Sequence, residues 1–156
     1  MSTLTNIRRE TNADGVCVLT FDRLGSAANI FDRATLEELA AHLQAIASDL
    51  QVKGVVLWSA KPSIFIAGAD LNALVSLREG DLEEFISLGQ QVFNSLAALN
   101  VPTVAAIHGA CVGGGYEVGL ACDYRVASPD RVTKIGLPET KLGILPAWGG
   151  STRFRG

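Results

Sequence analysis

The fold of this chain is decided by one stretch, Pro102-Thr-Val-Ala-Ala-Ile-His-Gly-Ala-Cys-Val-Gly-Gly-Gly-Tyr-Glu117. Residues 103–107 form a short apolar run that favours a buried strand, and the proline before them ends a preceding helix. The glycines at 113–115 then open a predicted helix that runs towards Ala121. A strand, a glycine turn and a helix in direct succession are typical of an α/β protein.

The same alternation extends along the chain in both directions. Strands are predicted at 16–21, 54–58, 64–66, 123–127 and 133–135, and the run at 54–58 is apolar enough to be buried on both faces of a parallel sheet. One helix is predicted after an N-cap at Asp32, and another from Asp81 with Glu84 as its capping-box partner. Their apolar residues have helical spacing, namely Leu36, Leu39, Ala40, Leu43, Ile46, Ala47 and Leu50, then Leu82, Phe85, Ile86, Val92, Phe93, Leu96 and Leu99. An α/β fold with largely parallel strand pairing is therefore expected.

Composition excludes several classes of protein. The 156 residues suffice for one compact domain spanning 1–156, and 48% hydrophobic with 19% charged residues is the balance of a soluble globular protein. A net charge of −3 without a basic stripe argues against nucleic-acid binding and against a polybasic membrane contact. We find no secretory signal and no membrane-spanning run, and the cysteines Cys17, Cys111 and Cys122 are widely spaced. These observations predict a cytoplasmic protein with buried reduced thiols and no metal.

Two glycine-containing segments can present backbone N–H groups to a ligand. They are Phe65-Ile-Ala-Gly-Ala-Asp70 and the turn at 113–115, and each joins a strand end to a helix start. A helix N-terminus offers free N–H groups and a partial positive charge, so two such turns facing each other would form an oxyanion hole. Taken alone, each segment is more often a device for packing or chain reversal. A phosphate loop is excluded, because no Lys-Ser/Thr pair follows the glycines, and the dinucleotide fingerprint is not matched.

Two glutamates lie near these turns in the sequence. Glu117 follows the second turn in the first turn of its helix, where it can act chemically or simply complement the helix dipole. Glu139 follows Pro138 between apolar segments, where it can be a catalytic carboxylate, a cap or an exposed loop residue. From the residues alone, both interpretations stay open for both glutamates.

Taken together, the segments resemble the crotonase (enoyl-CoA hydratase/isomerase) family. The resemblance covers essentially the whole chain in order and spacing, through the segments 65–71, 102–109, 113–117, 122–125, 137–144 and 146–150. It implies a crotonase-like spiral of ββα units. Members of the family continue past the position of Gly156 into further helices, so the C-terminal helical part of that fold is expected to be missing here.

The resemblance also implies roles for individual residues. The backbone N–H groups of Ala69 and Gly114 match the oxyanion-hole donors, and Glu117 and Glu139 match the two catalytic carboxylates of the hydratases. The presence of both glutamates favours a hydratase, while the acid and the base stay unassigned. The substrate would be a CoA thioester with no other cofactor, and substrate contacts are implied for Ala27, Ala67, Gly68, Asp70, Leu71, Gly113, Tyr116, Pro138 and Trp148.

Within the family, residues 29–32 and 135–144 are similar to the hydratase region of multifunctional fatty-acid β-oxidation proteins, in which a 3-hydroxyacyl-CoA dehydrogenase region follows. The expected reaction is addition of water across the 2,3-double bond of an enoyl-CoA. Two alternatives are Δ3-Δ2 enoyl-CoA isomerisation and a non-catalytic fragment that binds CoA thioesters. Expected partners are further copies of the chain or the dehydrogenase region.

Overall fold

The computed structural model describes residues 5–154. Residues 1–4 and 155–156 lie outside it, and residues 1–4 belong to the segment in which no secretory signal was found. Within the described range, no helix combines the length and the apolar character needed to cross a membrane.

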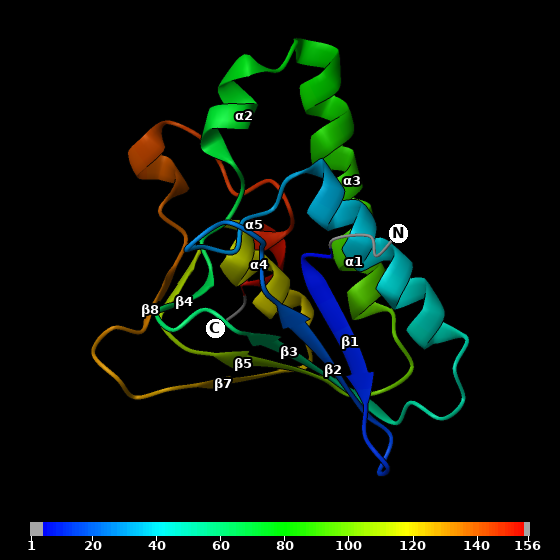
Figure 1. The fold of residues 1–156 in the computed structure, drawn as a ribbon. Helices are drawn as coiled ribbons and strands as arrows, with labels where there is room; N and C mark the ends of the chain where they lie inside the picture. The colour runs from blue at the N-terminus through cyan, green and yellow to red at the C-terminus, as the bar shows by residue number, and fades with distance from the viewer. Residues whose placement is uncertain (1–4, 155–156) are drawn as a thin grey trace.

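The larger of two sheets forms the base of the molecule (Figure 1). Its five strands lie in the order β1 (Ile7–Thr11), β2 (Val16–Phe21), β3 (Gly54–Ser59), β5 (Thr103–Ile107) and β7 (Tyr124–Ala127). Only β1 is antiparallel to its neighbour, and the other pairs are parallel. The predicted α/β class with largely parallel pairing is confirmed.

The smaller sheet is formed by the three strands that directly follow β3, β5 and β7 in the sequence. Its three parallel strands are β4 (Ile64–Ile66), β6 (Ala110–Val112) and β8 (Lys134–Gly136). A helical segment follows each pair: α2 (Leu71–Ser76) with α3 (Glu79–Ala97), α4 (Gly114–Ala121), and the 3-10 helix η1 (Glu139–Leu142). The chain therefore repeats a ββα unit, as the resemblance implies.

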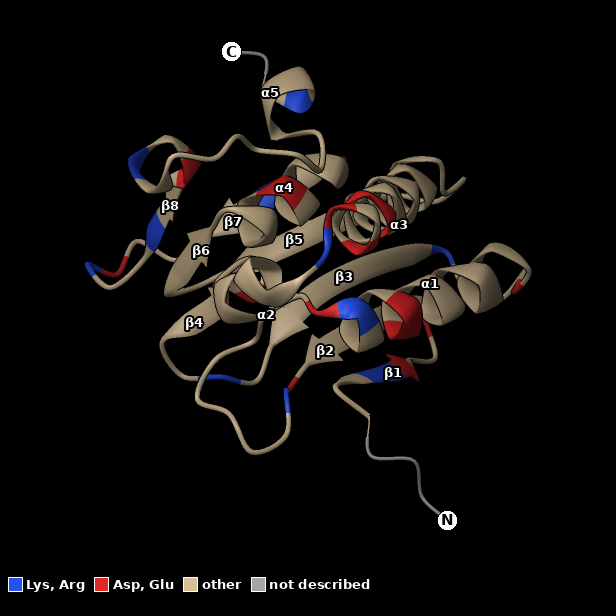
Figure 2. Ribbon diagram, turned by 90° about the horizontal axis from the view of Figure 1, so that it is seen from above, with Lys and Arg blue, Asp and Glu red and all other residues tan. Residues whose placement is uncertain are grey.

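One face of the larger sheet carries the core. Helices α1 (Arg33–Ala47), α3 and α4 lie on the same side of this sheet, and the short α5 (Gly150–Arg153) follows near the end of the chain (Figure 1). Along β2 the residues Cys17, Leu19 and Phe21 are buried, while those between them are partly exposed. Charged side chains lie on helices, on loops and on the outer strands β1, β7 and β8, whereas β2, β3 and β5 contain none (Figure 2). The apolar strands thus place their buried face under the helices.

Most predicted elements are found where the sequence placed them. The strands at 16–21 and 103–107 match β2 and β5 residue for residue, and the helix after 113 runs from Gly114 to Ala121 as predicted. Asp32 caps α1 by accepting a hydrogen bond from the backbone N–H of Thr35 at 2.8 Å. The three cysteines are free and buried, and burial raises the pKa of Cys111 and of Cys122 to about 12.

Three expectations were wrong. The capping box at Asp81 does not form, because α3 begins at Glu79 and its N-cap residue, Arg78, makes no side-chain cap hydrogen bond. Leu50 does not belong to the apolar stripe of α1, since the helix ends at Ala47 and Leu50 is 93% exposed. Strand β3 is not buried on both faces, because Trp58 points away from the helices and is 44% exposed.

Candidate active site

The first glycine turn joins β4 to α2. Gly68 has a φ of +97°, which a residue with a side chain rarely adopts, and it lets the chain reverse between the strand and the helix. Asp70 then caps α2, and its carboxylate accepts hydrogen bonds from the backbone N–H groups of Asn72 at 3.1 Å and Ala73 at 3.2 Å. Asp70 is therefore the N-cap of α2.

Residues 29–31 hold this turn from the side. The N–H of Phe31 donates to Gly68 O at 2.7 Å, and the N–H of Asp70 donates to Phe31 O at 3.1 Å. The N–H of Ala67 donates in turn to Asn29 O at 2.8 Å. Because these bonds fix the backbone on both sides of Ala69, the N–H of Ala69 points away from Phe31.

The second glycine turn faces the first. Gly113 has a φ of +55° and opens α4, and a methyl group placed on Gly68 would lie 3.1 Å from Val112 O and 3.4 Å from Gly114 N. The N–H groups of Ala69 and Gly114 donate no hydrogen bond to any residue in the range 5–154. Two unpaired donors from two facing turns are what a developing oxyanion requires.

Glu117 is buried in the first turn of α4 and is 2% exposed. Its Oε1 accepts backbone hydrogen bonds from Trp148 and Gly150, each at 2.9 Å. Burial raises the pKa of Glu117, these two hydrogen bonds lower it, the neighbouring Glu139 carboxylate raises it again, and the net shift is upward. Glu117 thus holds a proton at higher pH than an exposed glutamate does.

Glu139 begins η1, directly after its N-cap residue Pro138, and is 7% exposed. Its position as an exposed loop residue, one of the alternatives from the sequence, is wrong. A methyl group on Gly113 would lie 3.2 Å from Glu139 Oε1, so this carboxylate reaches the second glycine turn. Its Oε2 is buried and has no hydrogen-bond partner among the described residues. A buried carboxylate oxygen without a protein partner is free to bind a polar ligand.

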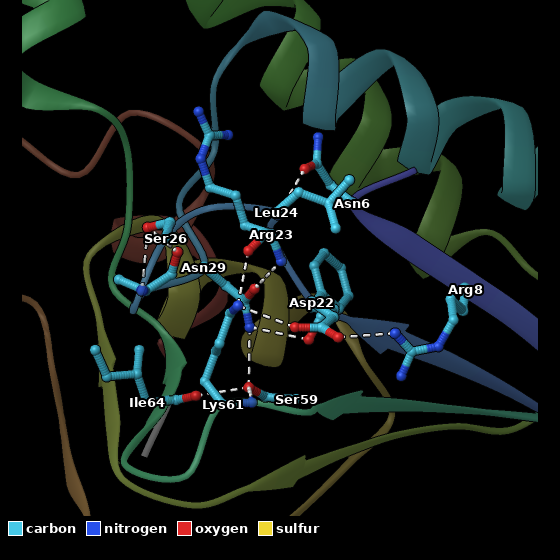
Figure 3. A network of polar contacts seen from close by, with 12 residues as sticks. Asn6, Arg8, Asp22, Arg23, Leu24, Ser26, Asn29, Ser59, Lys61 and Ile64 are labelled. Atoms are coloured by element: carbon cyan, nitrogen blue, oxygen red, sulfur yellow. Dashed lines mark hydrogen bonds and ion pairs between the residues drawn. The ribbon is translucent and has the colours of Figure 1, made fainter. Parts of the chain in front are cut away.

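A polar network fixes the loop that carries Ala27 (Figure 3). The buried amide of Asn29 donates to Phe21 O at 3.1 Å, Ser59 Oγ at 2.9 Å and Phe65 O at 3.1 Å. Its Oδ1 accepts from the N–H of Arg23 at 2.9 Å. Ala27 itself is exposed in this loop. The network therefore ties the loop to β2, β3 and β4, next to the first glycine turn.

The remaining predicted contact residues divide into two groups. Ala67, Gly68, Gly113 and Pro138 lie in the turns beside the unpaired N–H groups or next to Glu139. Leu71 is 44% exposed, and Tyr116 turns its ring towards Phe154, at a ring distance of 6.1 Å. Neither of these two side chains is brought against a glutamate by any contact of the described residues.

Trp148 is buried and lies against the second glycine turn. Its backbone N–H binds Glu117, and a methyl group on Gly114 would lie 2.6 Å from Cζ3 of the indole. The indole Nε1 is buried and has no acceptor within residues 5–154. Leaving such a donor unsatisfied costs about 1–3 kcal/mol.

Sequence reasoning missed the residues that support the site from a distance. Phe31 holds the first glycine turn through its backbone, and Gly150 supplies the second N–H to Glu117. Gly89 of α3 leaves room for the indole of Trp148, which a side chain there would overlap. Residues 29–32 and 146–150 carry part of the family resemblance, but nothing in these segments indicates the contacts described here, because each residue acts on a segment distant in the sequence.

The solved structures that this chain resembles define its class as a crotonase-type α/β protein. It is similar to an enoyl-CoA hydratase from Bacillus anthracis, with a TM-score of 0.88 and 34% identity over 96% of this chain and 57% of that one. It is also similar to an enoyl-CoA hydratase from Geobacillus kaustophilus, with a TM-score of 0.91 and 31% identity over 97% of this chain and 56% of that one.

A model of the enoyl-CoA hydratase/isomerase family matches residues 11–155, and the chain belongs to this family. It is 45% identical to the fatty acid oxidation complex subunit alpha of Idiomarina loihiensis over 146 residues, which are 93% of this chain and 21% of that protein. The corresponding subunit of Shewanella oneidensis is 45% identical over 148 residues, 94% of this chain and 21% of that protein. The chain thus spans about a fifth of the length of these curated relatives.

Proposed function

We propose that this chain catalyses the reversible addition of water across the 2,3-double bond of an enoyl-CoA. The observation that carries the proposal is the arrangement of Glu117 and Glu139 beside two facing glycine turns with unpaired N–H groups. Membership of the hydratase/isomerase family and the names of the relatives support the same reaction.

In the proposed reaction, the thioester oxygen binds the N–H groups of Ala69 and Gly114. Addition of the water oxygen to C3 breaks the π bond and moves an electron pair onto C2 and the thioester oxygen. Because both donors are already oriented, they stabilise this charge where it develops, and loss of one such donor typically costs about 3–4 kcal/mol. The cost is specific to the transition state, since the substrate carbonyl carries less charge.

The two carboxyl groups would divide the proton transfers. One accepts a proton from the attacking water, and the other delivers a proton to C2, so that the product gains one complete water molecule. Oε2 of Glu139 is buried without a protein partner, which suits it to hold the water. The raised pKa of Glu117 suits a carboxyl that holds a proton and delivers it to the substrate.

The test is the hydration of crotonyl-CoA, followed by loss of the absorbance of the conjugated enoyl thioester. We expect Glu117→Gln and Glu139→Gln each to lower kcat by about 100-fold or more, because each removes a general acid/base. Glu10→Gln serves as the matched control, since Glu10 is exposed on β1 and makes no side-chain hydrogen bond in the described range; its kcat should stay within about twofold. Full activity in either site variant, or no turnover by the folded wild-type chain, contradicts the proposal.

Isomerisation of a 3-enoyl-CoA to the 2-enoyl-CoA is a second candidate, favoured by the free Oε2 of Glu139. That reaction needs one carboxylate to move a proton between C2 and C4 over the same oxyanion hole. A Glu117→Gln variant that loses hydration but still converts 3-hexenoyl-CoA would assign isomerisation to Glu139. Loss of both reactions in this variant argues against a separate isomerase function.

The matching region makes up about a fifth of the longer relative, which suggests the kind of protein in which this chain acts. We propose that the chain corresponds to the hydratase portion of such a subunit. Its partners would then be a 3-hydroxyacyl-CoA dehydrogenase region or further copies of the chain.

A further inference from the structure

The indole of Trp148 fills the space between the second glycine turn and α3. It makes edge-to-face contacts with Phe31, Phe85 and Phe93, at ring distances of 5.9, 5.3 and 5.5 Å. On one side the ring lies on Gly114, and on the other it lies on Gly89 of α3. Residues without side chains at both contacts allow a ring of this size to fit between α4 and α3, which lie side by side (Figure 2).

The indole is held by shape alone. Its Nε1 finds no acceptor in the described part of the chain, although a buried tryptophan N–H is usually paired. The backbone of Trp148 is bound differently, because its N–H donates to Glu117 and its carbonyl accepts from Arg153 Nη1 at 2.8 Å. The ring can therefore change without disturbing the hydrogen bond to the glutamate.

An apolar cavity lies beyond the indole. Its volume is about 260 Å³, and its lining includes Ala73, Leu74 and Leu77 of the α2 segment and Phe85 of α3. Phe85 contacts both the indole and the cavity, because its ring packs on Trp148 and also forms part of the cavity lining. The cavity also adjoins Asp70, the residue after the donor Ala69. The cavity is thus close to the site, and Phe85 lies against both the cavity and the indole.

From this arrangement we propose that Trp148 determines the acyl chain length that the site accepts, an inference that rests on the proposed hydratase function. An acyl chain whose thioester oxygen binds Ala69 and Gly114 starts beside the indole. A short enoyl group lies alongside the ring and does not need the space that the ring occupies. A longer chain needs the space that the ring occupies, and removal of the ring opens this space as far as Phe85, which also lines the apolar cavity. The wild-type chain is therefore specific for short enoyl thioesters.

The test compares kcat/KM for crotonyl-CoA and trans-2-decenoyl-CoA in the wild type, Trp148→Ala, Trp148→Phe and Trp58→Ala. Apolar pockets distinguish substrates that differ by one methylene by about 10- to 200-fold. We expect the decenoyl-to-crotonyl ratio to rise at least about tenfold in Trp148→Ala and by less in Trp148→Phe. Trp58 lies on β3, is half-exposed and packs on His108, so the ratio should not change in Trp58→Ala.

An unchanged or lower ratio in folded Trp148→Ala overturns the inference and leaves the indole a packing residue. If Trp148→Ala does not fold, the ratio in Trp148→Phe decides in the same way. Turnover of neither thioester by the wild type contradicts the proposed hydratase function instead, and the binding experiment that follows still tests the role of the indole.

That experiment uses Trp58→Phe, in which Trp148 is the one tryptophan left of the two in the sequence. Its fluorescence is followed during titration with butyryl-CoA and with decanoyl-CoA. We expect butyryl-CoA to leave the emission maximum unchanged. Decanoyl-CoA should bind at least about tenfold more weakly, or shift the emission to longer wavelength as the ring leaves its aromatic neighbours. Equally tight binding of decanoyl-CoA without a shift overturns the inference.

Discussion

The two glutamates of the site are carried by segments that differ in almost every structural respect. In α4, six of eight residues are buried, and Glu117 is anchored by backbone N–H groups from a segment more than thirty residues downstream. In η1, Glu139 is the only buried residue of the four, and its side chain makes no hydrogen bond in the described range. The position of Glu117 is set by tertiary hydrogen bonds, and that of Glu139 by the local turn after Pro138.

The difference shows how one site can combine a fixed carboxylate with one whose oxygens stay available. Glu117 uses Oε1 for two structural hydrogen bonds. Glu139 keeps Oε2 free of hydrogen-bond partners among the described residues, and its side chain is anchored less firmly. Substitutions that disturb α4 should therefore affect folding, whereas those near η1 should affect chiefly the chemistry.

The largest effect is expected from Gly115→Ala in α4. A methyl group there would overlap the backbone carbonyl of Ile66, which belongs to β4 and cannot move independently. We expect a loss of about 4 kcal/mol in the free energy of unfolding, at the upper end of single-residue effects. Urea denaturation followed by circular dichroism measures it.

Gly136→Ala in β8, just before η1, is the matched control. A methyl group on Gly136 meets no atom within 4 Å, so we expect a change of about 0.5 kcal/mol or less. Equal losses in the two variants would show that the segments before Glu117 and Glu139 are equally constrained.

A smaller loss of stability is expected when the carboxylate of Glu117 is replaced by an apolar side chain. Glu117→Gln keeps an acceptor for the N–H groups of Trp148 and Gly150, whereas Glu117→Leu leaves both buried donors unpaired. We expect the leucine variant to be less stable than the glutamine variant by about 3 kcal/mol. Denaturation midpoints and slopes of the two variants give this difference.

The same pair of substitutions at Glu139 tests whether the fold anchors this second carboxylate less firmly than Glu117. Because Glu139 accepts no hydrogen bond from the described residues, Glu139→Leu and Glu139→Gln should differ by less than about 1 kcal/mol. A difference as large as that at Glu117 would mean that Glu139 is also anchored by the fold.

The smallest effect expected is the pH dependence of stability that Glu117 contributes. Burial raises its pKa above the ordinary value of 4.5, so the folded state holds the proton more tightly than the unfolded state does. The stability of the wild type relative to Glu117→Gln should therefore be greatest below pH 4.5 and fall as pH rises through the folded pKa. Urea unfolding of both proteins at several pH values measures the difference, and a relative stability that rises with pH contradicts it.

Much of the fold could be predicted, because its central strands and helices have strong local patterns. The runs at 16–21 and 103–107 and the glycine start of α4 are such patterns. Strand β1 was missed because only its first residue is buried, so its sequence shows no alternation. The capping box at Asp81 failed because an acidic residue in the first turn also suits the helix dipole without capping it.

The candidate site could be predicted less completely. Both glycine turns and both glutamates were singled out from the sequence, and the structure brings them together. The residues that hold them were not, since Phe31 and Gly150 act through the backbone, where residue type leaves little trace. The catalytic roles of the glutamates and of the two N–H groups remain proposals that the activity measurements test.

The anchoring of Glu117 also has a consequence for the order in which the site can be completed during synthesis. Its two hydrogen-bond donors lie 31 and 33 residues further along the chain. Chains emerge from the ribosome N-terminus first, and their early segments begin to fold before later ones exist. Both sheets can therefore be present while the carboxyl of Glu117 is still hydrated. The candidate site is complete only when the segment at 148–150 has been synthesised, so a nascent chain forms both sheets before the carboxyl of Glu117 is anchored.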